Sequence, residues 1–158
     1  MKKPGRIFVN AAGFTDFDDY FVYINDIAAD IPARLAEFFG DEERYALRSP
    51  ITLHDSWLKK LEISTCYNDN ECQTSVEIVL LHAMHEKSVH LWYRDVVSIE
   101  YIGAPIRWPS HAVDLLVHEF SQEAPGAFRH YMEFDRGVCL SLLFGGFEFE
   151  YRDIRRDS

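Results

Sequence analysis

The sequence predicts an α+β fold in which one antiparallel meander sheet of about seven strands carries one long, kinked N-terminal helix on one face. Two patterns predict it. Apolar and polar residues alternate over 128–151, and apolar residues recur every three or four positions over 17–38. A length of 158 residues suits one domain, so residues 1–158 are expected to form a single domain.

The helix is expected to run from about Asp16 to Phe39, because its apolar residues would form one continuous face. Pro32 removes a backbone donor, so we expect a kink there or a division into two helices, with Asp30 capping the second part. Gly40 is a suitable end. The apolar positions are Phe17, Phe21, Ile24, Ala28, Ile31, Leu35 and Phe38.

Alternating apolar residues also predict the strands. The hairpin in the middle of the chain would pair Leu81 with Val89, and the following segment is expected to bend near Asp95. Whether the sheet curls on itself or folds into two layers stays open. Strands are expected at about 56–65, 75–82, 88–94 and 95–102, with four more between Asp114 and Tyr151.

The last strands can be placed in register, because a slip of one residue would scatter their apolar side chains over both faces. Phe128 is expected opposite Phe144. Gly145-Gly146 would then turn the chain, so that Phe144 faces Phe147. The segment 147–151 becomes the last strand, and its free edge would allow a homodimer that pairs through this edge, although Glu148 and Glu150 would oppose such pairing.

Composition limits the partners. The chain carries 26 acidic and 16 basic residues, a formal net charge of −10, which argues against nucleic acid and against an anionic membrane. The charge favours a basic protein partner, although solubility alone would also explain it. An odd number of cysteines, 3, predicts free thiols, and no apolar run is long enough for a membrane span. We therefore expect a cytoplasmic protein.

Histidines are the main candidates for a binding site. If Phe120 faces Phe128, His118 directly faces His130 on the apolar side of the sheet. Two opposed imidazoles could bind a metal, or each could form hydrogen bonds that serve packing. The sequence shows no third ligand beyond isolated candidates, so neither a metal site nor a cofactor is assigned. The isolated candidates are His54, His82, His90 and His111.

His54, Asp55 and Ser56 contain the residue types of a hydrolytic triad. Adjacent side chains of a strand point to opposite faces, which argues against a triad here. Asp55 is expected to bind local backbone groups at the start of a strand. His54 and Asp55 therefore join His118 and His130 as candidate binding residues, and no catalytic residue is assigned.

A series of short motifs resembles small bacterial proteins of uncharacterised function, some of which are immunity proteins of toxin systems. The resemblance implies a single-domain cytoplasmic protein without known catalytic residues. Its motifs are Leu53-His54-Asp55, Asp114-Leu115-Leu116, His118-Glu119-Phe120, Phe128-Arg129-His130, Met132-Glu133-Phe134 before Arg136-Gly137, and Phe147-Glu148-Phe149.

Three functional hypotheses follow. The first is a non-enzymatic, immunity-like protein that binds a protein partner through its acidic surface. The second is a metal-binding or metal-dependent hydrolytic protein that uses His118 and His130. The third is a small-ligand binder with a pocket between helix and sheet, where Trp57 or Trp92 stacks on the ligand.

Overall fold

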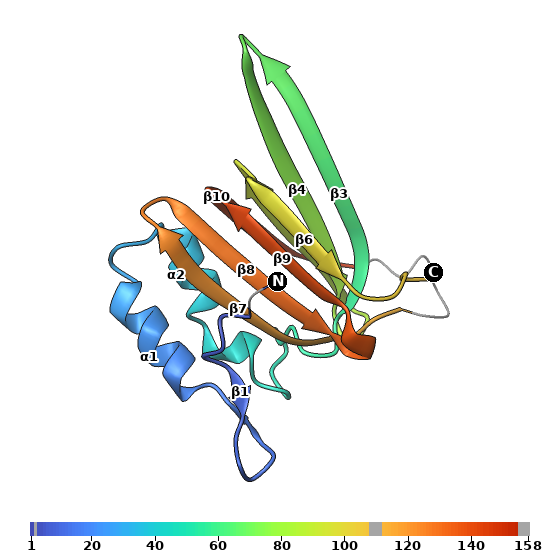
Figure 1. Ribbon diagram of the computed structural model, residues 1–158. Coiled ribbons are helices and arrows are strands. Elements are labelled where there is room, and N and C mark those ends of the chain that lie inside the picture. Colours follow the sequence, from blue (N-terminus) through green and yellow to red (C-terminus); the bar gives the residue numbers. More distant parts are fainter. Residues whose placement is uncertain (2, 108–111, 155–158) are drawn as a thin grey trace.

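A computed structural model describes residues 1, 3–107 and 112–154. Two four-stranded antiparallel sheets face each other, and a short ribbon of β1 (Phe8–Val9) and β2 (Thr15–Asp16) lies beside them (Figure 1). The first sheet has the order β10 (Gly146–Asp153), β5 (Lys87–Arg94), β4 (Glu71–Leu81), β3 (Trp57–Asn68). The second has the order β6 (Ser98–Ile102), β9 (Cys139–Phe144), β8 (Ala127–Phe134), β7 (Leu115–Ala124).

Two bends side by side join the sheets. The chain passes from β5 to β6 through Asp95, whose φ is 51°, and from β9 to β10 through Gly145. The N–H of Gly145 donates to the carbonyl of Arg94 at 3.1 Å, which ties the two bends together. A Cβ at Gly145 would lie 3.2 Å from the Cβ of Asp95, so this close approach favours glycine.

The predicted single meander is wrong. β10 pairs with β5, placing Phe147 opposite Tyr93, and it does not pair with β9. Both β9 and β10 turn their apolar faces toward the space between the sheets, so alternation alone did not reveal that the chain changes sheets at Gly145. The β8–β9 register is confirmed, with Phe128 opposite Phe144.

Two other registers differ from the prediction. Val89 lies opposite Leu80 rather than Leu81, because the turn is closed by a hydrogen bond from the N–H of His82 to the carbonyl of Lys87. Phe120 lies opposite His130 rather than Phe128. The β7–β8 turn is tighter than expected, with residue 124 opposite residue 127, and the register shifts between residues 122 and 124. This two-residue error leaves His118, Phe120 and His130 on their predicted face.

The predicted long, kinked helix is also wrong. Two separate short helices, α1 (Asp18–Ile27) and α2 (Ala33–Phe39), take its place. Pro32 occupies the N-cap of α2 with an extended ψ of 136°, which redirects the chain, and no side chain caps this helix, so Asp30 does not have its predicted role. Gly40 is the C-cap of α2, as expected. Short 3₁₀ turns follow at η1 (Glu42–Arg44) and η2 (Asp135–Gly137).

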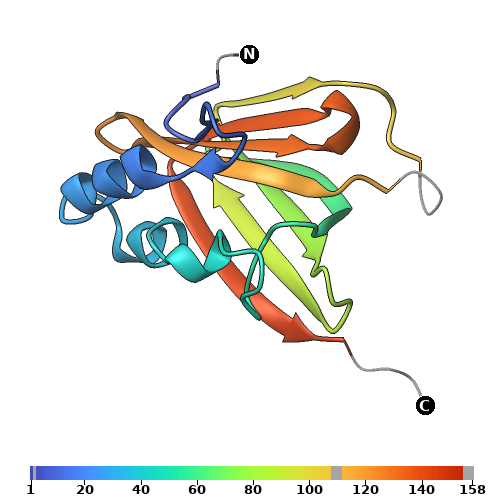
Figure 2. The ribbon, with the colours of Figure 1, turned by 90° about the horizontal axis from the view of Figure 1, so that it is seen from below.

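α2 fills the open side between the two sheets, next to β10 and β7, rather than lying on one sheet (Figure 2). Phe38 and Phe39 are completely buried there. Phe38 contacts Phe149 with ring centroids 4.8 Å apart, and Phe39 stacks on Phe120 at 4.6 Å. Arg34 donates to the carbonyl of Phe149 at 2.8 Å, so α2 also covers part of the β10 edge. None of the described helices is long and apolar enough to cross a membrane.

The β3–β4 hairpin extends well beyond the rest of the molecule (Figure 1). All ten residues of β3 after Leu58 are exposed, as are most of the first residues of β4. Asp69 and Asn70 form its two-residue turn with φ values of 45° and 73°, the backbone conformation of a type I′ turn.

Candidate functional site

His118 on β7 and His130 on β8 do meet in the structure. Nδ1 of His118 lies 3.1 Å from Nε2 of His130, and the hydroxyl of Tyr93 lies 2.7 Å from Nδ1 of His130. The pair is diagonal, because the observed register places His118 opposite Met132. His118 is only 3% exposed and His130 is completely buried.

The surroundings keep both imidazoles neutral. The ring of Tyr45 stacks on His118 at 4.4 Å. Burial, aided by the positive charge of Arg44, lowers the pKa of His118 to about 3. Burial and the neighbouring imidazole of His118 also hold the pKa of His130 well below its ordinary value. At pH 7 neither ring carries a charge.

The hydrogen bonds define one favourable arrangement of protons. If the Tyr93 hydroxyl donates to Nδ1 of His130, then Nε2–H of His130 donates to Nδ1 of His118. This arrangement leaves only Nε2–H of His118 without a partner among the described residues. The reverse arrangement would also leave the Tyr93 hydroxyl hydrogen unpaired, which costs more.

This pair is enclosed by the core. In the described part of the chain, no three His, Cys, Asp or Glu side chains are arranged to hold a metal ion. His82 instead accepts from the N–H of Met84, and His90 lies between Ser88 and Glu77. His111, which the sequence also offers as a third metal ligand, lies outside the described residues.

His54 and Asp55 form a surface pair, with Nδ1 and Oδ1 3.0 Å apart. The N–H of Asp55 donates to the carbonyl of Leu115, and its φ of 61° turns the chain into β3. Ser56 is completely buried, and its hydroxyl has no partner in the described structure, so the three residue types do not form a triad. No hydrogen bond between described residues joins this pair to His118.

The two tryptophans named as ligand contacts lie away from the helices. Trp57 packs on the ring of His85 at 4.5 Å. Trp92 lies between His90, at 5.5 Å, and the guanidinium of Arg152, at 5.4 Å. Both rings are on the outer face of the first sheet, since their strand neighbours fill the core. The phenylalanines of α2 fill the space between helix and sheets.

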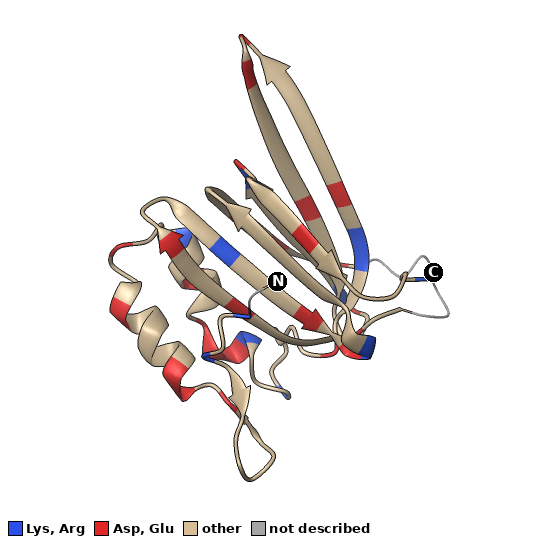
Figure 3. Cartoon of the chain, in the orientation of Figure 1, with Lys and Arg blue, Asp and Glu red and all other residues tan. Residues whose placement is uncertain are grey.

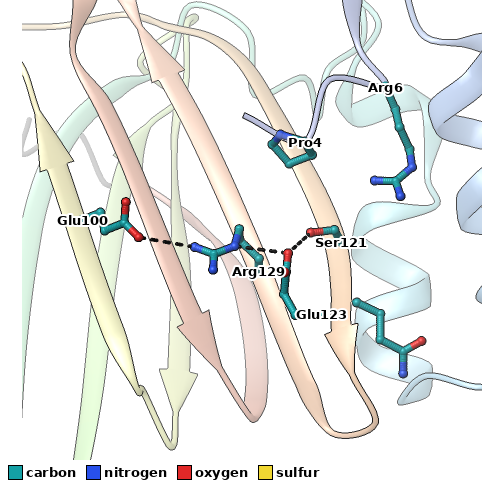
Figure 4. A pocket seen from close by; sticks show the side chains of 7 residues that line it. Pro4, Arg6, Glu100, Ser121, Glu123 and Arg129 are labelled. Atoms are coloured by element: carbon teal, nitrogen blue, oxygen red, sulfur yellow. Dashed lines mark hydrogen bonds and ion pairs between the residues drawn. The ribbon is translucent and has the colours of Figure 1, made fainter. Parts of the chain in front are cut away.

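A polar cavity of about 300 Å³ lies on the outer face of the second sheet (Figure 4). Arg129 is at its centre and donates to Glu123 at 3.2 Å and to Ser141 at 3.0 Å, with Glu100 at 3.8 Å. Arg6, the other basic residue of the lining, pairs with Glu119. Each guanidinium therefore has a carboxylate partner within the protein.

A larger groove, of about 720 Å³, lies between α1 and η1. Its floor is aromatic: the ring of Tyr45 meets Phe17 at 5.8 Å and Phe21 at 5.2 Å, edge-on in both cases. Val22 and Leu47 also line the groove and are 61% and 69% exposed. The groove therefore offers apolar side chains directly to solvent.

Carboxylates form the rim of this groove. Asp18, Glu42 and Glu43 line it, and no ion pair within the described residues neutralises them. Arg44 follows them in sequence but turns inward, where it is buried and pairs with Asp41. Asp41 also caps η1 by accepting from the N–H of Glu43 at 3.1 Å. In Figure 3, the ribbon of α1 carries acidic positions, coloured red, and no basic positions, coloured blue.

The sequence patterns do not predict this groove. Residues 16–19 lie at the start of the expected helix and residues 41–48 lie beyond its expected end at Gly40, so the two segments show no relation to each other. The available signal was that both segments combine carboxylates with neighbouring apolar or aromatic residues.

Among the described residues, the groove between α1 and η1, the buried histidine pair and the Arg129 cavity each combine chemically distinctive side chains. Comparison with known proteins adds no assignment to any of them. No family model matches the sequence, and no curated protein matches it significantly.

Proposed function

We propose that this protein is a non-enzymatic protein-binding module and that the groove between α1 and η1 receives a basic, partly apolar segment of its partner. The observation that carries the proposal is the combination of two exposed apolar side chains, Val22 and Leu47, over an aromatic floor with a rim of unpaired carboxylates. Exposed apolar surface surrounded by charge is typical of interaction sites.

The chemistry of the groove defines the partner segment. An amphipathic helix would lay its apolar side chains against Val22 and Leu47, and its Lys or Arg side chains would reach Glu42 and Glu43. The net charge of −10 would accelerate the encounter with such a partner by electrostatic steering. The resemblance to immunity-like bacterial proteins supports a basic toxin as the partner.

The test uses fluorescent amphipathic peptides of matched hydrophobicity, one set rich in lysine and one rich in glutamate. The basic set should bind, and the acidic set should not. The double variant Glu42→Lys/Glu43→Lys should weaken binding of the basic set about tenfold at low salt, mainly through the association rate.

The matched control is Glu71→Lys/Glu86→Lys, which changes the net charge equally at two exposed positions outside the groove. It should lower the affinity far less than the rim variant does. Equal losses from both variants would show that only overall charge matters, and this result would contradict a binding site at the groove.

A further inference from the structure

The outer edge of β3 is open. At its start the edge is covered, because Trp57 bridges to Asp114 and the N–H of Leu58 donates to Val113. From residue 59 to residue 68, no other described segment pairs with this edge. Long open edges invite pairing with a further strand. The opposite edge of the same sheet differs, because Arg34 of α2 covers it at Phe149.

The turn of the hairpin determines which backbone groups face outward. Asn68 and Glu71 flank a two-residue turn, so they form a hydrogen-bonded pair. Such pairs alternate along an antiparallel ladder, so the even-numbered residues of β3 bond to β4. The N–H and C=O groups at the open edge therefore belong to Leu61, Ile63, Thr65 and Tyr67.

The same four residues direct their side chains to the inner face of the sheet, because Leu61 lies opposite the core residue Ile78. Leu61, Ile63 and Tyr67 are nevertheless 38%, 55% and 80% exposed, since the hairpin extends past the opposing sheet. The ring of Tyr67 at the hairpin tip is the most exposed of the large apolar side chains described.

An apolar groove of about 300 Å³ lies at the base of this hairpin, between β3 and the second sheet. One strand therefore carries an exposed aromatic ring at one end and an apolar groove at the other. The groove is lined by residues that include Leu58, Leu61, Tyr101, Ile106, Phe134 and Leu140.

We propose that two copies of this chain pair antiparallel through β3, with the two-fold axis at Ser64, so that Tyr67 of each copy fills the groove of the other. In this register Leu61 lies opposite Tyr67 of the second copy, and Ile63 lies opposite Thr65. The outward-facing groups then form about eight backbone hydrogen bonds between the copies.

Self-pairing suits this strand for two further reasons. On the outer face, Lys60 comes opposite Asn68 and Glu62 opposite Cys66 of the second copy, so no like charges meet. The hairpin turn of the second copy lies next to residues 58 and 59 of the first copy. The paired segment therefore ends where Asp114 begins to cover the β3 edge of the first copy. The two-fold arrangement uses the open β3 edge of both copies at once, so pairing through this edge closes at a dimer.

Sedimentation equilibrium tests the proposal over a range of protein concentrations. The protein should dimerise reversibly, and Tyr67→Ala should weaken the dimer at least tenfold. The control Met84→Ala removes an apolar side chain that is 68% exposed on another turn and should leave the dimer unchanged. A monomer at every concentration up to about 0.5 mM, or equal effects of both variants, would overturn the proposal.

Cross-linking tests the register. In a background of Cys66→Ser, Cys72→Ser and Cys139→Ser, the variant Ser64→Cys should form a disulfide-linked dimer on mild oxidation. Residue 64 faces itself across the axis in a non-hydrogen-bonded pair, whose Cα atoms are about 4.5 Å apart. Lys60→Cys lies opposite Asn68 and should not link. Equal linking of both variants would contradict pairing centred on Ser64.

Discussion

Acid should destabilise this protein steeply between pH 7 and pH 5, because of the buried histidine pair. Burial depresses the pKa of His118 and of His130 below the value of about 6.5 that each has in the unfolded chain. As the pH falls, the unfolded state therefore binds protons that the folded state does not bind. The stability that depends on this difference is complete above pH 6.5 and is lost as the pH falls toward 3.

The magnitude follows from the pKa of His118, which is about 3. At pH 5 the unfolded side chain is almost fully protonated, and the difference of about 1.5 pH units between pH 5 and the unfolded pKa lowers the free energy of unfolding by about 2 kcal/mol for His118. This loss is a large share of the 5–15 kcal/mol typical of a domain, and His130 adds a further loss of the same sign.

Urea unfolding at pH 7, 6 and 5 measures the effect. The variant His118→Gln removes one of the two groups, so between pH 7 and pH 5 its free energy of unfolding should fall by about 2 kcal/mol less than that of the wild type. His85→Gln, at an exposed position, should show the wild-type pH dependence. An equal pH dependence in His118→Gln and the wild type would refute the reasoning.

Other groups also titrate, which is why the comparison between variants matters. Burial lowers the pKa of His82, which adds to the loss in acid. Burial raises the pKa of Glu119 and of Asp114, so these two carboxyls favour the folded state as the pH falls. These contributions are common to wild type and His118→Gln and cancel in their difference.

Three further variants test the packing, each by urea or thermal unfolding. Phe39→Ala should cost about 3–5 kcal/mol, because the ring fills the space between α2 and both sheets; a loss below about 1 kcal/mol would contradict that role. Removing residues 1–7 deletes three backbone N–H groups that donate to the buried carboxylate of Glu119 at 2.9–3.3 Å. The loss of these hydrogen bonds should lower the free energy of unfolding by roughly 3 kcal/mol, and an unchanged melting temperature would contradict this stabilising role. Gly145→Val should cost about 1–3 kcal/mol by pushing against Asp95, whereas Gly126→Val, which meets no atom within 4 Å, should suffer only from its positive φ.

Local patterns predicted that β4 pairs with β5, β7 with β8 and β8 with β9, but they predicted the correct register only for the last of these hairpins. The β8–β9 register is correct because a short turn joins two strands whose alternation agrees, so only one pairing keeps both apolar faces together. The predicted proximity of His118 and His130 is correct although the predicted register is wrong, because a slip of two residues leaves both side chains on the same face of the sheet.

Choices between distant partners could not be predicted from the same patterns. The alternation in β10 is equally compatible with β9 and with β5 as neighbours, and only the bend at Gly145 decides between them. Helical periodicity continues through Pro32 although the chain changes direction there. The groove between α1 and η1 combines residues near 17–25 with residues near 42–47, and no local period links two such segments.

The chain passes from one sheet to the other at the paired bends, and this path determines when each sheet can be completed during synthesis. The first sheet begins with β3, β4 and β5, yet its last member, β10, ends only at Asp153. Until the ribosome has released that segment, the nascent chain must expose the side of β5 that β10 will cover. The slowest and most aggregation-sensitive stage of folding should therefore be the late return of the C-terminal strand, and a chaperone that shields β5 would have its greatest effect at that stage.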